Sequence, residues 1–192
     1  MKTCWEPGWS VYLSQSDNPK RKLKYTLELT NSGNALICVN TGMTNKIVHE
    51  ALLADKIIEL TGYDNIKPEQ KILDSRLDFY LTAKEKPETY VEVKNVTLLG
   101  DNKRALFPDS VTTRGQKHLK DLIKIKKQGA RAIMFYLVNR QDVDSFSPAI
   151  DIDPVYASLL KEAQESGVEI LVYQTKITED EITTANKLPL VL

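Results

Sequence analysis

The chain of 192 residues has little of what marks a secreted or membrane protein. Its two cysteines, Cys4 and Cys38, are too few for a disulfide framework, and no spacing resembles a zinc site. No basic segment followed by an apolar run opens the chain, and no stretch approaches the roughly 18 to 20 apolar residues of a membrane span. We therefore expect a cytoplasmic protein without a membrane partner.

The chain also has no excess of positive or negative charge. Lys and Arg together number 26, and so do Asp and Glu, which leaves a formal net charge of zero. Without a global basic field, any contact with nucleic acid must come from local patches. The length suffices for one domain with a full core, or for one domain with a small addition.

Residues 1–42 read as a small antiparallel β unit. Short apolar and β-branched runs at 9–13, 25–29 and 35–39 are separated by turn-forming residues. Three strands are too few to close a barrel, since a barrel of the OB type takes about five. We expect this unit to be incomplete or docked on the rest of the chain.

Residues 43–192 read as an α/β domain. Cap and stop signals predict helices at 44–60, 113–128 and 154–166. A strand hairpin is expected between 75 and 94, and apolar runs at 132–138 and 168–173 are typical of strands buried on both faces. The order helix, hairpin, helix, strand, helix, strand predicts a mixed sheet flanked by helices.

The expected hairpin carries the most informative chemistry. A direct register about a turn at 84–89 makes three cross-strand pairs, Asp78 with Glu92, Tyr80 with Tyr90, and Arg76 with Lys94. Opposed acids destabilise a sheet unless a cation lies beside them, and the candidates are a divalent metal or Lys94.

This arrangement predicts a catalytic set of Asp78, Glu92 and Lys94, in which Asp78 and Glu92 bind Mg²⁺ or Mn²⁺ for phosphodiester hydrolysis. The alternative is a charged cross-strand network on a solvated sheet face, which is common in antiparallel pairs.

Four longer motifs point further: SRLDF at 75–79, YVEVKNVTL at 90–98, FPDSVTTRGQKHL at 107–119 and SDNPKRK at 16–22. Together with NTG at 40–42, GYD at 62–64 and IDP at 152–154, they resemble the sugar fermentation stimulation protein family, SfsA. The resemblance implies an OB-like N-terminal domain, a PD-(D/E)XK nuclease-like C-terminal domain, DNA binding and a link to sugar metabolism.

The chain departs from the family pattern at its start. Family members usually carry the first strands of the OB-like domain before the position of residues 8–13, and residues 1–7 do not supply them. Either the short form is natural or its start is displaced. We therefore expect a truncated OB-like subdomain at 1–42 and the nuclease-like domain at 43–192. Leu77 replaces the proline that usually precedes the acid at Asp78.

The resemblance adds further site residues. It makes Glu50 either a third metal ligand or a carboxylate that supports the metal ligands, although an exposed helix acid explains this residue equally well. It also implies that Gln116, at the start of the second helix, reaches the active site, as in one subgroup of this nuclease class. Arg114 and the free N–H groups of that helix end could hold a phosphate; the alternative is an ordinary helix start with a solvated Arg. His118 is a candidate contact to a DNA phosphate or a catalytic contact because the family motif includes it, and otherwise a structural or surface histidine.

Two basic groups could neutralise backbone phosphates, or could serve only as solvated faces. The first group is Lys20, Arg21 and Lys22. Helical spacing places the second on one face of the second helix: Lys117, Lys120, Lys124 and Lys127.

Three functions remain open at this stage: a Mg²⁺-dependent nuclease, a non-catalytic DNA-binding regulator of sugar metabolism genes, and an RNA- or nucleotide-processing enzyme. DNA is the expected partner, and a homodimer is left open.

Overall fold

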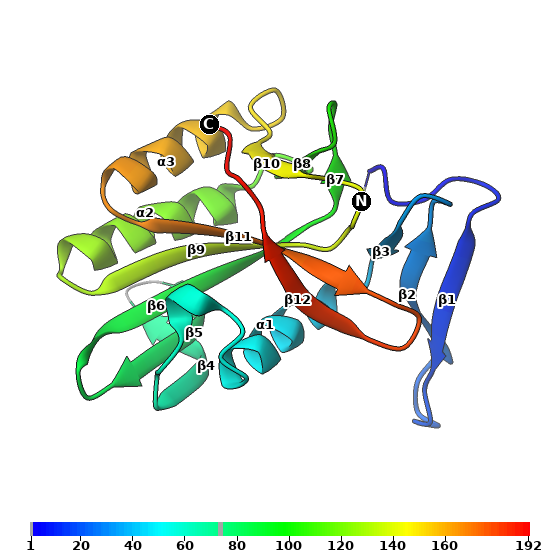
Figure 1. The fold of residues 1–192 in the computed structure, drawn as a ribbon, viewed down its shortest axis with the longest axis horizontal. Coiled ribbons are helices and arrows are strands. Elements are labelled where there is room, and N and C mark those ends of the chain that lie inside the picture. Colours follow the sequence, from blue (N-terminus) through cyan, green and yellow to red (C-terminus); the bar gives the residue numbers. More distant parts are fainter. Residues whose placement is uncertain (1, 73–74) are drawn as a thin grey trace.

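The computed structural model describes residues 2–72 and 75–192. Its centre is a six-stranded mixed sheet in the order β12–β11–β9–β6–β5–β4 (Figure 1). The central strands β6, β9 and β11 are parallel, and the outer strands on both sides pair antiparallel. The strands are β4 (Asn65–Ile72), β5 (Ser75–Ala83), β6 (Lys86–Val96), β9 (Arg131–Val138), β11 (Glu169–Ile177) and β12 (Ile182–Lys187).

Helices cover both faces of this sheet. On one face α1 (Thr44–Leu53) buries an apolar cluster, and on the other α2 (Thr113–Lys127) and α3 (Pro154–Glu165) bury a second cluster. All side chains of residues 132–138 in β9 are fully buried, which confirms the strand predicted from the uninterrupted apolar run. The predicted mixed sheet flanked by helices is confirmed. No helix within the described residues is long and apolar enough to cross a membrane.

Two smaller sheets complete the fold. β1 (Ser10–Gln15), β2 (Tyr25–Asn31) and β3 (Leu36–Cys38) form an antiparallel sheet beside the main body (Figure 1). A third sheet has the order β10–β8–β7 and contains β7 (Leu98–Leu99), β8 (Arg104–Phe107) and β10 (Ser145–Pro148). Single turns of 3₁₀ helix occupy Thr41–Met43 and Ile58–Leu60.

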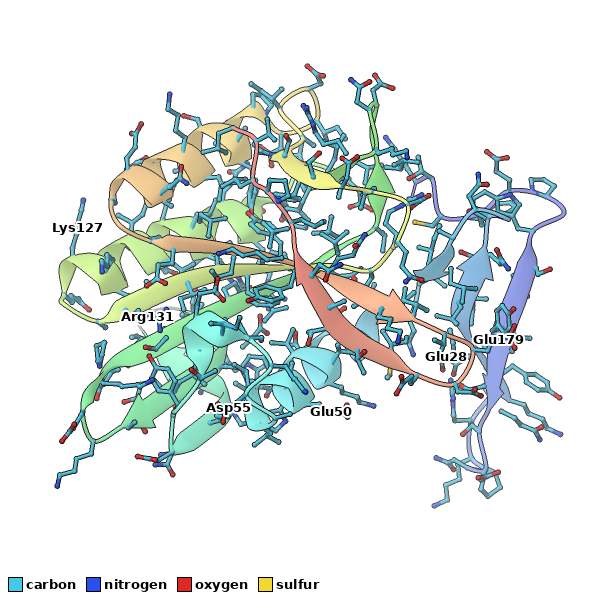
Figure 2. All side chains as sticks on the ribbon, in the orientation of Figure 1. Glu28, Glu50, Asp55, Lys127, Arg131 and Glu179 are labelled. Carbon is cyan, nitrogen blue, oxygen red and sulfur yellow. The ribbon has the colours of Figure 1, made fainter. Side chains whose placement is uncertain are left out.

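The N-terminal sheet is docked on the end of β9. Ile37 forms a bridge with Arg140, and the N–H of Cys38 donates to the carbonyl of Asn139 at 3.0 Å. The guanidinium of Arg140 is buried, makes two bonds of 2.7 and 2.8 Å to Asp142, and donates to a backbone carbonyl. At the other edge of this sheet, Tyr12 of β1 donates to Glu179 in the β11–β12 turn, at 2.7 Å (Figure 2).

The helix predicted at 44–60 is too long, because the structure divides this segment into α1 and a separate 3₁₀ turn. Helix α1 ends at Leu53 because Asp55 adopts a left-handed φ of 49°, which an α-helix does not accommodate, and residues 58–60 form the 3₁₀ turn.

The predicted hairpin turn at 84–89 is also corrected. The turn comprises residues 84 and 85, so Pro87 lies inside β6. A proline is tolerated there because it lies at the register shift of the β5–β6 ladder, between the paired residues Lys86 and Thr89, and because β6 begins to pair with β9 only at Thr89.

Several strands were not predicted, among them the two edge strands of the main sheet. β4 and β12 are mostly polar and at most partly buried, so neither shows the apolar pattern of a core strand.

We expect Arg140→Ala to lower the free energy of unfolding by about 3 kcal/mol, because it removes the cationic partner of Asp142 and a hydrogen bond to a buried carbonyl. Urea unfolding measures the loss. The control is Arg76→Ala, whose side chain is 58% exposed and pairs with Glu69 at 3.3 Å, and which we expect to lose less than about 1 kcal/mol. Equal losses of unfolding free energy in the two variants would contradict the role of Arg140 in docking the N-terminal sheet.

Candidate functional site

The two hairpin strands pair in the predicted register over three pairs only, from Leu81–Thr89 to Phe79–Val91. Tyr80 lies opposite Tyr90, as predicted, and the two rings are 4.8 Å apart. The ladder stops at the next pair, Phe79 with Val91, because from there β5 pairs only with β4 and β6 only with β9. The sheet therefore opens into a fork, and the expected pairs 78–92 and 76–94 are not backbone pairs.

Asp78 occupies this fork. Its Oδ2 accepts the backbone N–H of Val93 at 2.7 Å, and its Oδ1 accepts the amide of Asn45, at the start of α1, at 2.7 Å. Burial raises the pKa of the Asp78 carboxyl, and the negative charge of Glu92 raises it further. The acid is thus held by neutral donors, close to a second carboxylate.

Glu92 is supported differently. Its Oε1 accepts a hydrogen bond from Lys94 Nζ at 2.6 Å and a short one from His118 Nδ1, while Oε2 is buried and has no hydrogen-bond partner among the described residues. Burial acts to raise the pKa of Glu92, but the His118 hydrogen bond and the Lys94 charge outweigh burial and lower it. The predicted proximity of Glu92 and Lys94 is present.

These residues line one cleft of about 360 Å³. Two carboxylates face two cationic side chains there, Lys94 from β6 and Arg114 from the first turn of α2. The lining residues are Thr41, Gly42, Thr44, Asn45, Asp78, Glu92, Val93, Lys94, Asn95 and Arg114. The sequence predicted four of them as site residues, namely Asp78, Glu92, Lys94 and Arg114, and did not predict Asn45.

The cleft suits a hard divalent cation with few protein ligands. No cluster of three or more Asp, Glu, His or Cys residues that could hold a metal occurs within 2–72 and 75–192. Mg²⁺ is commonly held by one or two carboxylates and keeps several waters. Asp78 and the unpaired Oε2 of Glu92 fit that requirement, because a buried acceptor without a donor favours a cation.

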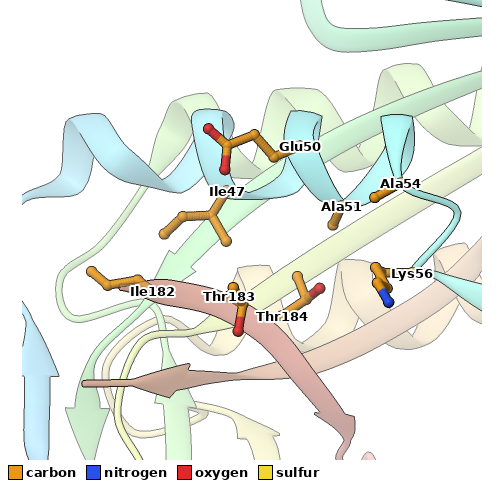
Figure 3. Close-up of a pocket in the computed structure, with 8 residues that line it drawn as sticks. All are labelled: Ile47, Glu50, Ala51, Ala54, Lys56, Ile182, Thr183 and Thr184. Carbon is orange, nitrogen blue, oxygen red and sulfur yellow. The ribbon is translucent and has the colours of Figure 1, made fainter. Parts of the chain in front are cut away.

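Glu50 does not reach this cleft. It lines a separate pocket of about 440 Å³ between α1 and β12, with Ile47, Ala51 and Thr184 among its neighbours (Figure 3). Glu50 follows Asn45 by five positions, so it is rotated by about 140° around the helix. The side chain that α1 directs to Asp78 is therefore the amide of Asn45, not a third carboxylate.

The two residues between Gly115 and His118 are bound outside the cleft. Gln116 donates to both carboxylate oxygens of Asp153, at 3.0 and 3.1 Å. Lys117 donates to the hydroxyl of Ser75 at 2.6 Å and lies 3.3 Å from Asp121. Of the expected phosphate contacts in this motif, the structure brings only Arg114 into the cleft.

The two basic groups lie far apart. Lys20, Arg21 and Lys22 are exposed in the β1–β2 loop, at the other end of the molecule from α2 (Figure 1). The lysines at 117, 120, 124 and 127 share the exposed side of α2, and Figure 2 shows Lys127 at its end. Only the α2 group belongs to an element that also enters the cleft.

Two family models match this chain. Residues 42–181 match the sugar fermentation stimulation protein RE domain, and residues 1–39 match the SfsA N-terminal OB domain. The chain belongs to the sugar fermentation stimulation protein family. The family membership expected from the sequence is therefore confirmed.

One solved structure agrees with this membership. Pyrococcus furiosus SfsA in complex with Ca²⁺ matches with a TM-score of 0.86 and 30% identity, over 95% of this chain and 78% of that chain. The small subunit of the heterodimeric restriction endonuclease R.BspD6I matches with a TM-score of 0.33 and 15% identity, over 68% of this chain and 62% of that chain. The second score is too low to support an argument.

Asp153 anchors the start of α2 and thereby the position of Arg114. Its carboxylate accepts the N–H of Thr112 before α2 and the N–H of Tyr156 in α3, each at 2.9 Å, besides the Gln116 amide. Burial acts to raise the pKa of Asp153, but these hydrogen bonds outweigh it and hold the pKa below its ordinary value of 3.8.

Asp153 is the N-cap of α3. We expect Asp153→Ala to lower the free energy of unfolding at neutral pH by about 2 kcal/mol, because it removes this helix cap and the buried hydrogen bonds to the start of α2. Because the folded-state pKa is lowered, this stabilisation is present above the unfolded-state pKa and is lost as pH falls through the folded-state pKa. The difference between wild type and variant therefore narrows below about pH 4.

Urea unfolding at neutral pH and at about pH 3 measures this difference. The control, Asp151→Ala, changes an exposed acid two residues earlier and is expected to stay within about 0.5 kcal/mol of wild type. If Asp153→Ala loses the same unfolding free energy at both pH values, the ionised Asp153 carboxylate is not the source of this stabilisation.

Proposed function

We propose that this protein binds DNA and hydrolyses its phosphodiester bonds with a divalent metal in the cleft at the β5–β6 fork. The observation that carries the proposal is the convergence of Asp78, Glu92, Lys94 and Arg114 on one cleft, with Oε2 of Glu92 unpaired. The rival view, a charged network on a solvated sheet face, is disfavoured because Glu92 is 3% exposed and Lys94 13% exposed.

Asp78 and Glu92 are the proposed ligands of Mg²⁺ or Mn²⁺, whose chemistry is to polarise the scissile phosphate and to lower the pKa of bound water. The Pyrococcus furiosus relative was solved with Ca²⁺, which prefers the same oxygen ligands. That relative supports a divalent cation as cofactor of this chain, and the choice of Mg²⁺ or Mn²⁺ follows from the reaction proposed.

The protein's own cations have separate proposed roles. Lys94, held against Glu92, orients the attacking water or stabilises the charge that develops on phosphorus. Arg114 presents a guanidinium at the start of α2, where it binds a phosphate oxygen pair. The two carboxylates balance these two cations, so a divalent cation makes the cleft positive and complementary to a phosphodiester.

DNA is the proposed substrate because α2 links the cleft to a basic surface. The exposed lysines of this helix can neutralise backbone phosphates on either side of the phosphate at Arg114. The loop with Lys20, Arg21 and Lys22 is a second candidate contact, which only a long duplex could reach from the cleft.

We expect Asp78→Asn, Glu92→Gln and Lys94→Ala each to reduce metal-dependent DNA cleavage by at least about 100-fold, because each removes a ligand or a charge at the phosphate. Cleavage of single-stranded, duplex and branched DNA with Mg²⁺ or Mn²⁺ measures the effect. Glu85→Gln is the matched control, since it removes an acid of the same hairpin in the exposed turn.

If the wild-type chain binds DNA without cleaving any of these substrates, it is a binding regulator on a nuclease scaffold. Cleavage that persists in all three variants would place the activity outside this cleft.

We expect Arg114→Ala to weaken DNA binding and to lower the slope of log affinity against log salt by about one unit, the loss of one phosphate contact. Fluorescence anisotropy at several salt concentrations measures both quantities. Lys84→Ala, in the exposed hairpin turn, is the control and should leave the slope unchanged. An unchanged slope in Arg114→Ala would remove the phosphate contact from the proposal.

A further inference from the structure

A buried histidine from α2 holds the metal-facing carboxylate of β6. His118 is 4% exposed, and its Nδ1 makes a hydrogen bond with Oε1 of Glu92. An ionised carboxylate only accepts hydrogen bonds, so the hydrogen of this bond belongs to Nδ1. A polar ring on the buried side of an amphipathic helix requires such a partner, and here the partner is the candidate ligand itself.

Both protein donors reach the same oxygen of Glu92. Lys94 Nζ lies 2.6 Å from Oε1 and 3.2 Å from Nδ1 of His118, so three polar groups meet around one atom. Oε2 receives no donor from the described residues although it is buried. Two donors from different elements fix the rotation of the carboxylate, because turning it would break both bonds.

We infer that His118 is a positioning residue, which holds Oε1 of Glu92 so that Oε2 stays available to the cation. This inference rests on the metal site of the proposed function. Lys94 alone does not fix the carboxylate in this way, since its flexible side chain comes from the same strand two residues away and can move between the two oxygens. The ring of His118, anchored in a packed helix, cannot follow such a movement.

The same helix then serves two parts of the site. Arg114 and His118 are four residues apart on α2, so they lie on neighbouring turns of one face. Arg114 lines the cleft, and His118 bonds the carboxylate beneath it. Docking of α2 on the sheet therefore positions both Arg114, the proposed phosphate contact, and Glu92, the proposed metal ligand.

The test is calorimetric binding of Mn²⁺ and of Ca²⁺ to the full chain, without DNA, in four forms: wild type, His118→Leu, His118→Gln and His118→Asn. The Asn amide can place a donor near the position of Nδ1, whereas Gln reaches toward Nε2 and Leu supplies no donor. We expect affinity to fall about 10- to 100-fold in the Leu and Gln variants and to stay within a few-fold of wild type in the Asn variant.

The structural control is Thr175→Val, which removes a different buried hydrogen bond of 3.1 Å and keeps the side-chain shape. Its cation affinity should equal that of wild type, and thermal unfolding shows which variants are folded. Two polar replacements with different reach keep the test decisive if the Leu variant does not fold.

Each other outcome overturns a stated part of the argument. If wild type binds neither cation, the proposed function fails and this inference fails with it. If wild type binds and the folded Leu or Gln variant binds equally well, His118 does not position Glu92, and the proposed function stands. If Asn loses as much affinity as Gln, the ring shape rather than the Nδ1 hydrogen bond is required, and the inference is wrong.

Discussion

Beyond Phe79 and Val91 the ladder between β5 and β6 stops, and the N–H of Val93 donates to the carboxylate of Asp78 instead of to a strand carbonyl. A buried N–H without an acceptor is costly, so this one side chain allows the two strands to separate. That separation opens the cleft. In the cleft the carboxylate of Asp78 lies close enough to feel the charge of Glu92, and α2 contributes Arg114 to the lining.

The fork places two acids together in unlike surroundings. Glu92 has a lysine and a histidine on one oxygen, and its pKa is lowered; Asp78 has only neutral donors, and its pKa is raised by burial and by Glu92. The lysine and the histidine therefore favour the ionised form of Glu92. A cation beside Asp78 would offset the charge of Glu92, which is one of the two effects that raise the pKa of Asp78, whereas the larger effect of burial would remain.

Period-two alternation predicted the shared face of Glu92 and Lys94, because that depends only on neighbours along a strand, and the direct register about the turn predicted the Tyr80–Tyr90 pair. The fork was not predictable in that way, since the end of a ladder depends on which other strand each partner joins. Asn45 rather than Glu50 faces Asp78 because packing sets the rotation of α1. The contact of His118 with Glu92 depends on how α2 docks on the sheet, so the residues around His118 in the sequence do not predict it.

The proposed function requires rigid support at this fork, because a carboxylate displaced by about an ångström would no longer hold a cation and a phosphate in line. The support comes from three elements that meet only in the fold. Asn45 of α1 fixes Asp78, His118 of α2 fixes Glu92, and Asp153 ties the start of α2 to α3. Each contact is a hydrogen bond across elements distant in sequence, so the site is assembled only when both helical layers are packed on the sheet.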